Sequence, residues 1–554
     1  MQSVIQLKRS SADRLATAML IITTAFTIAA VGAGTANAAP AKLNDGVLTI
    51  TGTNGSNVIA LRLKSAHRGI LQVDLGDDGG ANFSFKRKRV KKIVLNARGG
   101  ADVARIDEVN GVFTDTIPTK INGEDGGDTL LGGSGAETLR GGNGTDSLDG
   151  NVGSDRAVLG AGNDVFVWDP GDGSDVVEGQ GGADTMRFNG ADVAEQVELS
   201  ANGSRLKFFR TQGAITMDTA GIERVDFNAL GGADLVTVND LTGTDVDAVN
   251  VDLAGTLGGV TGDGTADSVV VNATNGVDTV DVSGDATGVA VSGLLARTAI
   301  THQEATDVLT VNGRDGNDDI SGTNLAAAAI STTLAGDDGE DALTGSPGIE
   351  TTRGGNGSDS LDGNGGNDQA VLGAGDDVFV WDPGDGSDVV EGQGGADTMR
   401  FNGADVAEQV ELSPNGTRLK FFRTQGAITM DTAGVERVEF NALGGADLVT
   451  VNDLTGTDVD AVNIELAGAL GGITGDGAAD NVVVNATNGV DTIFVEGDAD
   501  SLKVIGLAAA VQILRSEFAN DRLDINTLAG NDRVDADGLE IGAIKLFVDG
   551  LLVP

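Results

Sequence analysis

Short runs of alternating apolar and polar residues recur along the chain after residue 38, and glycine, asparagine or aspartate bounds each run. Strict alternation over four to eight residues is typical of a strand with one buried face, and the bounding residues favour turns. The pattern therefore predicts an all-β chain of short strands. Clear examples are RLKFFR from Arg205, DLVTVND from Asp234, DSVVVNA from Asp267, DTVDVSG from Asp278 and DVLTVNG from Asp307.

Comparison of the chain with itself reveals an internal duplication with an offset of 213 residues. The segment Leu159–Ser200 recurs as Leu372–Ser413, and the exchange of Asn163 for Asp376 is the only difference. Long duplications of this kind indicate a modular repeat protein. We predict an N-terminal strand-rich segment at 39–92, repeat modules at 93–305 and 306–518, and a truncated third module at 519–554.

A nine-residue period of acidic residues runs inside each module. The period in the first module is interrupted by one eleven-residue step within WDPGDGSD, and the second module repeats the same spacing. The acidic positions are Asp128, Glu137, Asp146, Asp155, Asp164, Asp175 and Asp184 in the first module, and Asp341, Glu350, Asp359, Asp368, Asp377, Asp388 and Asp397 in the second.

The clearest nine-residue unit is GGNGTDSLD from Gly141, and its twin in the second module is GGNGSDSLD from Gly354. Its glycine-rich half can adopt positive φ angles and turn tightly. The three residues that follow form a very short strand with one inward apolar side chain, such as Leu148. Two units then complete one solenoid turn of eighteen residues.

This turn length places acidic residues close together on both edges of the solenoid. Asp128, Asp146 and Asp164 stack along one edge, and Glu137 and Asp155 stack along the other. Carboxylates at such separations repel one another unless a cation lies between them. Carbonyl oxygens of the glycine turns add further ligands, and an all-oxygen, flexible cage suits Ca²⁺ better than zinc or a redox metal.

The units resemble the GGxGxDxUx nonapeptide of the RTX, or hemolysin-type calcium-binding, repeat family. The resemblance covers residues 121–189 and 334–402 and implies a parallel β-roll or β-solenoid whose GGxGxD turns bind Ca²⁺ through the aspartate and backbone carbonyls. The implied metal-site residues are Asp128, Gly141, Gly142, Gly144, Asp146, Asp155 and Asp164, and Asp341, Gly354, Gly355, Gly357, Asp359, Asp368 and Asp377.

Several units depart from the nonapeptide pattern, and we expect some sites to be weak or empty. Glu137 and Glu350 replace the aspartate, and Pro347 interrupts one turn. The eleven-residue step shifts the register by two, so the residues after it, Asp175, Asp184, Asp388 and Asp397, are left out of the implied metal-site residues. Between the nonapeptide runs, a continued solenoid and a sandwich both remain compatible with the short strands.

The first 38 residues have the composition of a cleaved secretory signal. Lys8, Arg9 and Arg14 precede an apolar stretch from Leu15 to Val31, and small residues follow up to Ala38. This order predicts secretion, to the extracellular space or the cell surface. No later segment is long and apolar enough to span a bilayer.

The remaining chain is strongly acidic, and its composition limits its chemistry. Without the signal the formal charge is −49, which disfavours nucleic acid as a partner and favours cations. Cysteine is absent, so neither disulfides nor thiolate zinc sites are available. With two histidines, His67 and His302, and no tyrosine, we expect no catalytic centre and no cofactor other than Ca²⁺.

Three further features have a structural and a functional interpretation. The basic run Lys86–Lys92 is more often a solvated strand face or a processing site than a grip for anionic cell-envelope polymer or another copy of the chain. Trp168 and Trp381 could stack on sugar, but packing of the solenoid is the commoner role. The same holds for the pairs Phe208-Phe209 and Phe421-Phe422.

Together these observations predict a secreted or cell-surface protein with a structural or adhesive role, which folds on binding Ca²⁺ outside the cell. Calcium ions are the expected partners, and cell-envelope polymers or other copies of the chain are candidates. One alternative is an adhesin solenoid that folds without calcium. The other is an extracellular enzyme that carries calcium-binding repeats.

Overall fold

The computed structural model describes residues 41–553, and its regular structure is almost entirely β-strand. The helices in that range are two short 3-10 turns, Arg87–Arg89 and Gln425–Ala427. Neither of them is long and apolar enough to cross a membrane. The predicted secretory signal, residues 1–38, lies outside the described residues.

The chain forms two compact units, which are described separately. Unit 1 comprises the chain up to Leu230 together with Leu241–Val251, and unit 2 comprises Gly231–Asp240 and the chain from Asp252 onwards. The change from one unit to the other thus lies before the boundary between the two sequence modules at residues 305 and 306. Each unit contains one complete run of nonapeptides.

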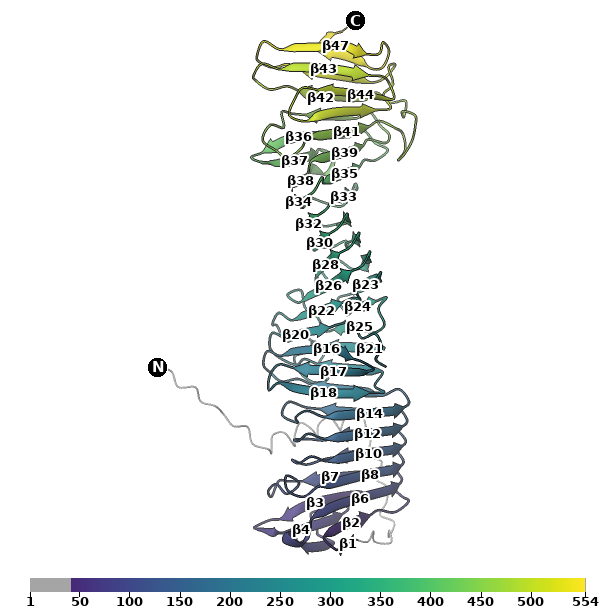
Figure 1. Cartoon of the computed structure of the whole chain (residues 1–554), viewed down its shortest axis with the longest axis vertical. Helices are drawn as coiled ribbons and strands as arrows, with labels where there is room; N and C mark the ends of the chain where they lie inside the picture. Colours follow the sequence, from purple (N-terminus) through teal and green to yellow (C-terminus); the bar gives the residue numbers. More distant parts are fainter. Residues whose placement is uncertain (1–40, 554) are drawn as a thin grey trace, which may run out of the picture. The chain divides into compact units, whose positions relative to one another are not determined.

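Unit 1 is a parallel β-solenoid in which the chain alternates between two sheets, so that successive strands of one sheet lie above one another (Figure 1). The first sheet pairs β2 (Val47–Thr51), β6 (Lys92–Gly99), β8 (Thr119–Asp125), β10 (Thr138–Asn143), β12 (Arg156–Ala161), β14 (Val176–Gly181) and β18 (Ile215–Ala220). The second pairs β3 (Val58–Lys64), β7 (Val103–Asp107), β9 (Thr129–Leu131), β11 (Ser147–Asp149), β13 (Val165–Trp168), β15 (Thr185–Asn189) and β19 (Arg224–Asn228).

The core of unit 1 lies between these two sheets, and the nine-residue unit supplies it with one apolar residue per short strand. Leu130, Leu139 and Leu148 are completely buried, as the repeat predicts. Alternate residues of the longer strands are also buried, because side chains of a strand point to opposite faces. The predicted fold class, an all-β parallel solenoid, is therefore confirmed.

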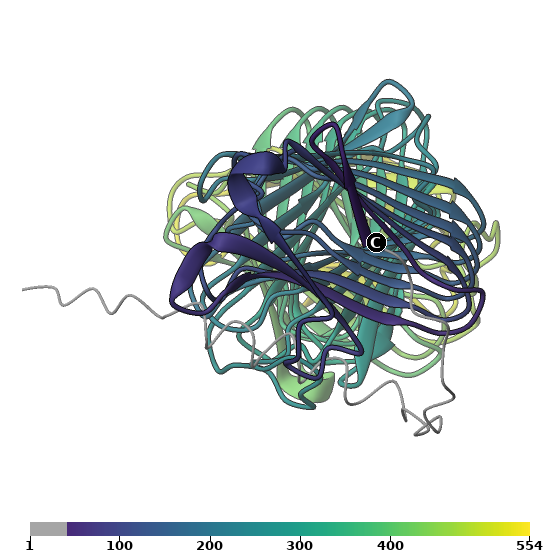
Figure 2. The same ribbon diagram turned by 90° about the horizontal axis from the view of Figure 1, so that it is seen from below.

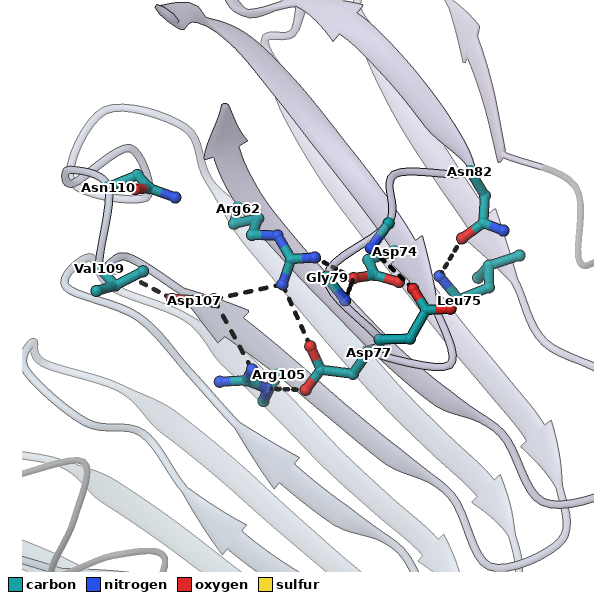
Figure 3. A network of polar contacts seen from close by, with 12 residues as sticks. Arg62, Asp74, Leu75, Asp77, Gly79, Asn82, Arg105, Asp107, Val109 and Asn110 are labelled. Atoms are coloured by element: carbon teal, nitrogen blue, oxygen red, sulfur yellow. Dashed lines mark hydrogen bonds and ion pairs between the residues drawn. The ribbon is translucent and has the colours of Figure 1, made fainter. Parts of the chain in front are cut away.

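Antiparallel strands cover the beginning of unit 1, where the purple segment lies nearest the viewer in Figure 2. Charged side chains connect this segment to the solenoid (Figure 3). Asp77 accepts from Arg105 Nε at 2.6 Å and from Arg62 Nη1 at 3.3 Å, and Arg62 also reaches Asp107 at 3.7 Å. The covering strands are β1 (Ala41–Asn44), β4 (His67–Leu75) and β5 (Phe83–Lys86).

Unit 2 repeats the two-sheet solenoid and adds wider turns. Its first sheet contains β20 (Leu235–Val238), β22 (Ser268–Asn272), β26 (Val308–Asp315), β28 (Ser331–Asp338), β30 (Glu350–Asn356), β32 (Gln369–Ala374), β34 (Val389–Gly394), β38 (Ile428–Ala433), β40 (Leu448–Val451), β42 (Asn481–Asn485), β46 (Arg522–Asn526) and β48 (Lys545–Val548). Its second sheet contains β23 (Thr279–Asp285), β27 (Asp319–Leu325), β29 (Ala342–Thr344), β31 (Ser360–Asp362), β33 (Val378–Trp381), β35 (Thr398–Asn402), β39 (Arg437–Asn441), β41 (Ala461–Glu465), β45 (Ala510–Leu514), and the pair β43 (Thr492–Gly497) and β47 (Arg533–Leu539).

Within each unit, the spans outside the nonapeptide run continue the solenoid, which decides between the two predicted alternatives. In these spans, some consecutive strands pair antiparallel as hairpins, which we call excursions from the parallel stack. The third module also continues the solenoid, because β46 and β48 pair in parallel within the first sheet of unit 2. The excursions use β16 (Gln196–Asn202), β17 (Arg205–Arg210), β24 (Gly288–Ser292), β25 (Arg297–Thr301), β36 (Gln409–Asn415), β37 (Arg418–Arg423) and β44 (Ser501–Ile505).

Candidate metal sites

The predicted acidic residues of unit 1 stack in two ladders, one along each edge of the solenoid. The backbone N–H of Asp128 donates to Asp146 Oδ1 at 2.7 Å, and the N–H of Asp146 donates to Asp164 Oδ1 at 2.7 Å. On the other edge, Glu137 N–H donates to Asp155 Oδ1 at 2.6 Å. Both edges follow the predicted eighteen-residue turn.

The eleven-residue step does not interrupt these ladders. Asp155 N–H donates to Asp175 Oδ1 at 2.7 Å, and Asp164 N–H donates to Asp184 Oδ1 at 2.9 Å. A local turn accommodates the two extra residues. In this turn, Asp169 N–H donates to Asp172 Oδ2 at 2.7 Å. Asp175 and Asp184 therefore occupy the same kind of position as the regular repeats, although the sequence indicated weaker candidates.

Unit 2 contains the same two ladders. On one edge, Asp341, Asp359 and Asp377 each donate a backbone N–H to the next acidic residue, at 2.9, 2.8 and 3.0 Å, and the last acceptor is Asp397. On the other edge, Glu350 donates to Asp368, and Asp368 donates to Asp388, both at 2.8 Å. Two copies of the sequence thus produce the same arrangement.

One carboxylate oxygen of each ladder aspartate is buried and has no hydrogen-bond partner. Oδ1 accepts the N–H of the previous turn, whereas Oδ2 is left without a donor. Buried polar atoms in proteins are nearly always satisfied, and such exceptions often mark the position of an ion. The unsatisfied Oδ2 atoms belong to Asp128, Asp146, Asp155, Asp164, Asp175, Asp184, Asp341, Asp359, Asp368, Asp377, Asp388 and Asp397.

The glycines of each turn bring backbone atoms close to these carboxylates. A Cβ atom on Gly141 would lie 2.4 Å from Asp146 Oδ2, and one on Gly354 would lie 2.4 Å from Asp359 Oδ2. At Gly144, where φ is +141°, a Cβ would lie 1.9 Å from the carbonyl oxygen of the turn before. Only glycine leaves this space open, so carbonyl and carboxylate oxygens can face a common ion.

The glycines at positions two and four of the nine-residue unit have positive φ angles in both modules. Gly142 and Gly355 have φ angles of +127° and +121°, and Gly357 has a φ of +137°. Gly141 and Gly142 lie at the end of β10, and Gly354 and Gly355 lie at the end of β30. The other sequence-predicted site residues lie between strands, in the turns that contain the ladders. The turns thus hold the aspartates for which the resemblance to the repeat family implies metal binding.

Burial strongly disfavours the charged form of these carboxylates when no cation is bound. Burial, together with the neighbouring ladder carboxylates, raises the pKa of Asp146 to about 7 and that of Asp155 to about 9. The pKa of Asp368 is raised to about 8 by the same causes. A cation beside the ionised carboxylates would reverse this effect.

The residues fit an oxygen-ligated cation whose ligands come partly from the backbone. Among residues 41–553, no group of three or more acidic or histidine side chains has the arrangement of a metal site. The turns instead offer carboxylates of successive turns together with backbone carbonyls, and Ca²⁺ accepts such mixed oxygen sets.

Sequence reasoning missed further members of the ladders, among them Asp102, Asp318 and Asp447. Asp102 donates its N–H to Asp128 Oδ1 at 2.8 Å, and Asp318 donates to Asp341 Oδ1 at 2.8 Å. In a wider turn, Asp447 donates to Asp480 Oδ1 at 2.9 Å. Their Oδ2 atoms are also buried and unsatisfied. The motifs GRDGND from Gly313 and GGAD from Gly444 were available signals, but their spacing is not nine residues.

The two tryptophans are core residues, as their preferred interpretation predicts. Trp168 is 1% exposed, its ring centre lies 4.3 Å from that of Phe188, and its Nε1–H donates to the Gly173 carbonyl at 3.0 Å. Trp381 is completely buried and repeats this packing. Phe208 also lies in this aromatic cluster, which fills the core beside the eleven-residue step.

Comparison with known proteins identifies the turns that carry these ladders. The model of the RTX calcium-binding nonapeptide repeat matches four segments, residues 131–166, 171–192, 344–379 and 384–405. No curated protein matches the sequence. The solved structure of the extracellular lipase LipA from Serratia marcescens is 16% identical, with a TM-score of 0.13, and the match covers 60% of this chain and 43% of that chain. This chain thus spans less than half of the lipase.

Proposed function

We propose that this chain, which carries RTX calcium-binding nonapeptide repeats in both of its units, is a secreted or cell-surface structural protein that folds on binding Ca²⁺ outside the cell. The repeats themselves are calcium-binding elements. The proposal adds secretion, a structural or adhesive role and the folding switch. The proposed role requires no catalytic centre.

The buried, unsatisfied carboxylate oxygens are the observation that carries this proposal. Asp146 and Asp164 in unit 1 and Asp359 and Asp377 in unit 2 each have an Oδ2 atom without a donor. In a folded chain without metal, these atoms are costly whether the carboxylates are ionised or protonated. A bound Ca²⁺ supplies the positive charge and the coordination that the protein leaves open.

The consequence is a coupling between calcium concentration and folding. Where calcium is scarce, repulsion between the stacked carboxylates opposes closure of the turns. At millimolar extracellular calcium, the free energy of binding adds to the free energy of folding, so even weak individual sites suffice. The secretory signal predicted for residues 1–38 supports a location where calcium is abundant.

The test is far-UV circular dichroism of residues 39–554 during calcium titration of a chelated sample, with magnesium as the control. We expect a cooperative gain of β signal at sub-millimolar to millimolar calcium and none with magnesium, which prefers a rigid octahedral shell. A spectrum that calcium leaves unchanged would overturn the switch and favour a solenoid that folds without calcium.

A further inference from the structure

Unit 1 exposes a row of basic side chains on the outer face of its first sheet. Lys92, Lys120, Arg140 and Arg156 lie on the successive strands β6, β8, β10 and β12, at positions whose sequence neighbours point into the core. We call these four residues the basic face. Lys120 is half-buried, and the other three are exposed. Lys120 pairs with Val94 and Thr138, and Arg140 pairs with Asn122, so each basic residue is offset by two positions from the next. The charges therefore form a staggered row across the sheet, with neighbours about 7–8 Å apart.

The basic face is under-neutralised although the chain has a large acidic excess. Within residues 41–553, Lys92, Lys120 and Arg140 have no carboxylate within ion-pair distance, and Arg156 reaches only Glu178, at 3.7 Å. Neighbouring charges are instead positive: burial lowers the pKa of Lys120, and Arg140 and Lys92 lower it further. Such a surface attracts a negatively charged partner.

Amide side chains and an open hollow accompany these charges. Asn96, Asn122 and Arg140 occupy one row across β6, β8 and β10, and Asn122 Nδ2 donates to Asn96 Oδ1 at 2.6 Å. Beside them lies a hollow of ≈ 480 Å³. It is lined by Arg140, Arg156, Val158, Glu178, Gln180, Ala220 and Gly221.

The second module shows that the solenoid does not need these cations. Ile93 pairs with Thr119 in unit 1, as Leu309 pairs with Thr332 in unit 2, so the two sheets have the same register. Three of the four basic positions are therefore neutral in the second module. The residues that correspond to Lys92, Lys120, Arg140 and Arg156 are Val308, Thr333, Arg353 and Gln369.

We propose that the basic face binds an acidic polysaccharide that runs across the successive strands β6, β8, β10 and β12 of unit 1. The row of cations matches the repeated carboxylates of a linear polymer, and guanidinium groups bind carboxylates in a planar, bidentate way. The interleaved amides and Gln180 supply hydrogen bonds suited to sugar hydroxyls. The basic run Lys86–Lys92 leads into β6, so its last residue, Lys92, is the first member of the basic face.

This inference deepens the proposed structural role and rests on it, because it names a partner for the secreted protein. The experiment measures binding of the calcium-loaded chain, residues 39–554, to immobilised polygalacturonate at several salt concentrations. The test variant is Lys120→Gln with Arg140→Gln, and the matched control is Arg353→Gln in the second module. Circular dichroism and calcium titration of each sample verify folding and the calcium response.

We expect salt-sensitive binding by the wild type and a loss of at least about tenfold in the double variant, since each cation beside an anionic surface contributes about fivefold. The affinity of Arg353→Gln should stay within about twofold of the wild type, because the other three corresponding positions of the second module are neutral. Equal binding by wild type and double variant, with the calcium response intact, would overturn this inference alone.

Two further arms separate the alternative partners. Binding to long-chain polyphosphate but not to polygalacturonate would overturn the polysaccharide in favour of a phosphate polymer. Sedimentation that reveals self-association of the wild type, abolished in the double variant, would overturn it in favour of a second copy of the chain. Loss of the calcium response in the wild type would instead contradict the proposed function.

Discussion

The backbone N–H of Asp146 donates to Oδ1 of Asp164, one solenoid turn away, at 2.7 Å, while Oδ2 of both residues is buried without a donor. One oxygen of each carboxylate therefore holds adjacent turns together, and the other is available to a metal ion. The structural role and the proposed metal-binding role thus fall to two different atoms of the same side chain. This division leads to variants in which the two roles can be separated.

Replacement of Asp146 by asparagine should reduce calcium affinity more than it disturbs the metal-free fold. The amide oxygen can still accept the N–H of Asp128, but the negative charge beside the ion is lost. We expect affinity at the affected sites to fall at least about tenfold, measured by isothermal titration calorimetry. Asp192→Asn, at an exposed position, is the control. An equal effect of both variants would contradict a local site at Asp146.

Stability without calcium should decrease as pH rises. The folded-state pKa values of Asp146, Asp155 and Asp368 are about 7, 9 and 8, above the ordinary aspartate pKa of 3.8. Their stabilising contribution is therefore complete below pH 3.8 and is lost as pH rises through 7 to 9. We expect the melting temperature in chelator to fall between pH 5 and pH 9, measured by calorimetry.

Calcium should reverse this pH dependence. Binding requires ionised carboxylates, so protons compete with Ca²⁺ at the ladder positions. The rise in melting temperature on addition of calcium should therefore be larger at pH 8 than at pH 5, and binding near pH 7 should release protons. A calcium effect that is independent of pH would contradict ligation by these carboxylates.

Gly144→Ala should destabilise the solenoid strongly. The new Cβ would lie 1.9 Å from a carbonyl oxygen of the adjacent turn, at a φ of +141°. The backbone conformation alone costs about 1–3 kcal/mol, and the contact adds to this cost. Gly203→Ala is the control, because Gly203 has a φ of +68° and no atom within 4 Å of the added carbon. The control variant should lose only about 1 kcal/mol of unfolding free energy. Chemical denaturation of both variants in the presence of calcium measures this difference.

The sequence predicted the solenoid and the regular ladders because each depends on a strict local period. Nine-residue spacing places Asp128, Asp146 and Asp164 on one edge without knowledge of the rest of the fold. Asp102 and Asp447 were not predicted, since their partners lie 26 and 33 residues away and the hairpins between them vary in length. Register between distant strands is set by packing, which no local period encodes.

Asp447 tests whether metal binding extends into the wide turns. It is 3% exposed, its Oδ2 is unsatisfied, and burial raises its pKa to about 7. Leu443 and Gly445, which precede it, have φ angles of +65° and +122°, so the turn has the same backbone form as a nonapeptide turn. If this turn binds a cation, Asp447→Asn should lower the calcium stoichiometry of the full chain, whereas the exposed control Glu540→Gln should not. Unchanged stoichiometry and affinity would confine calcium to the nonapeptide turns and assign Asp447 to stacking alone.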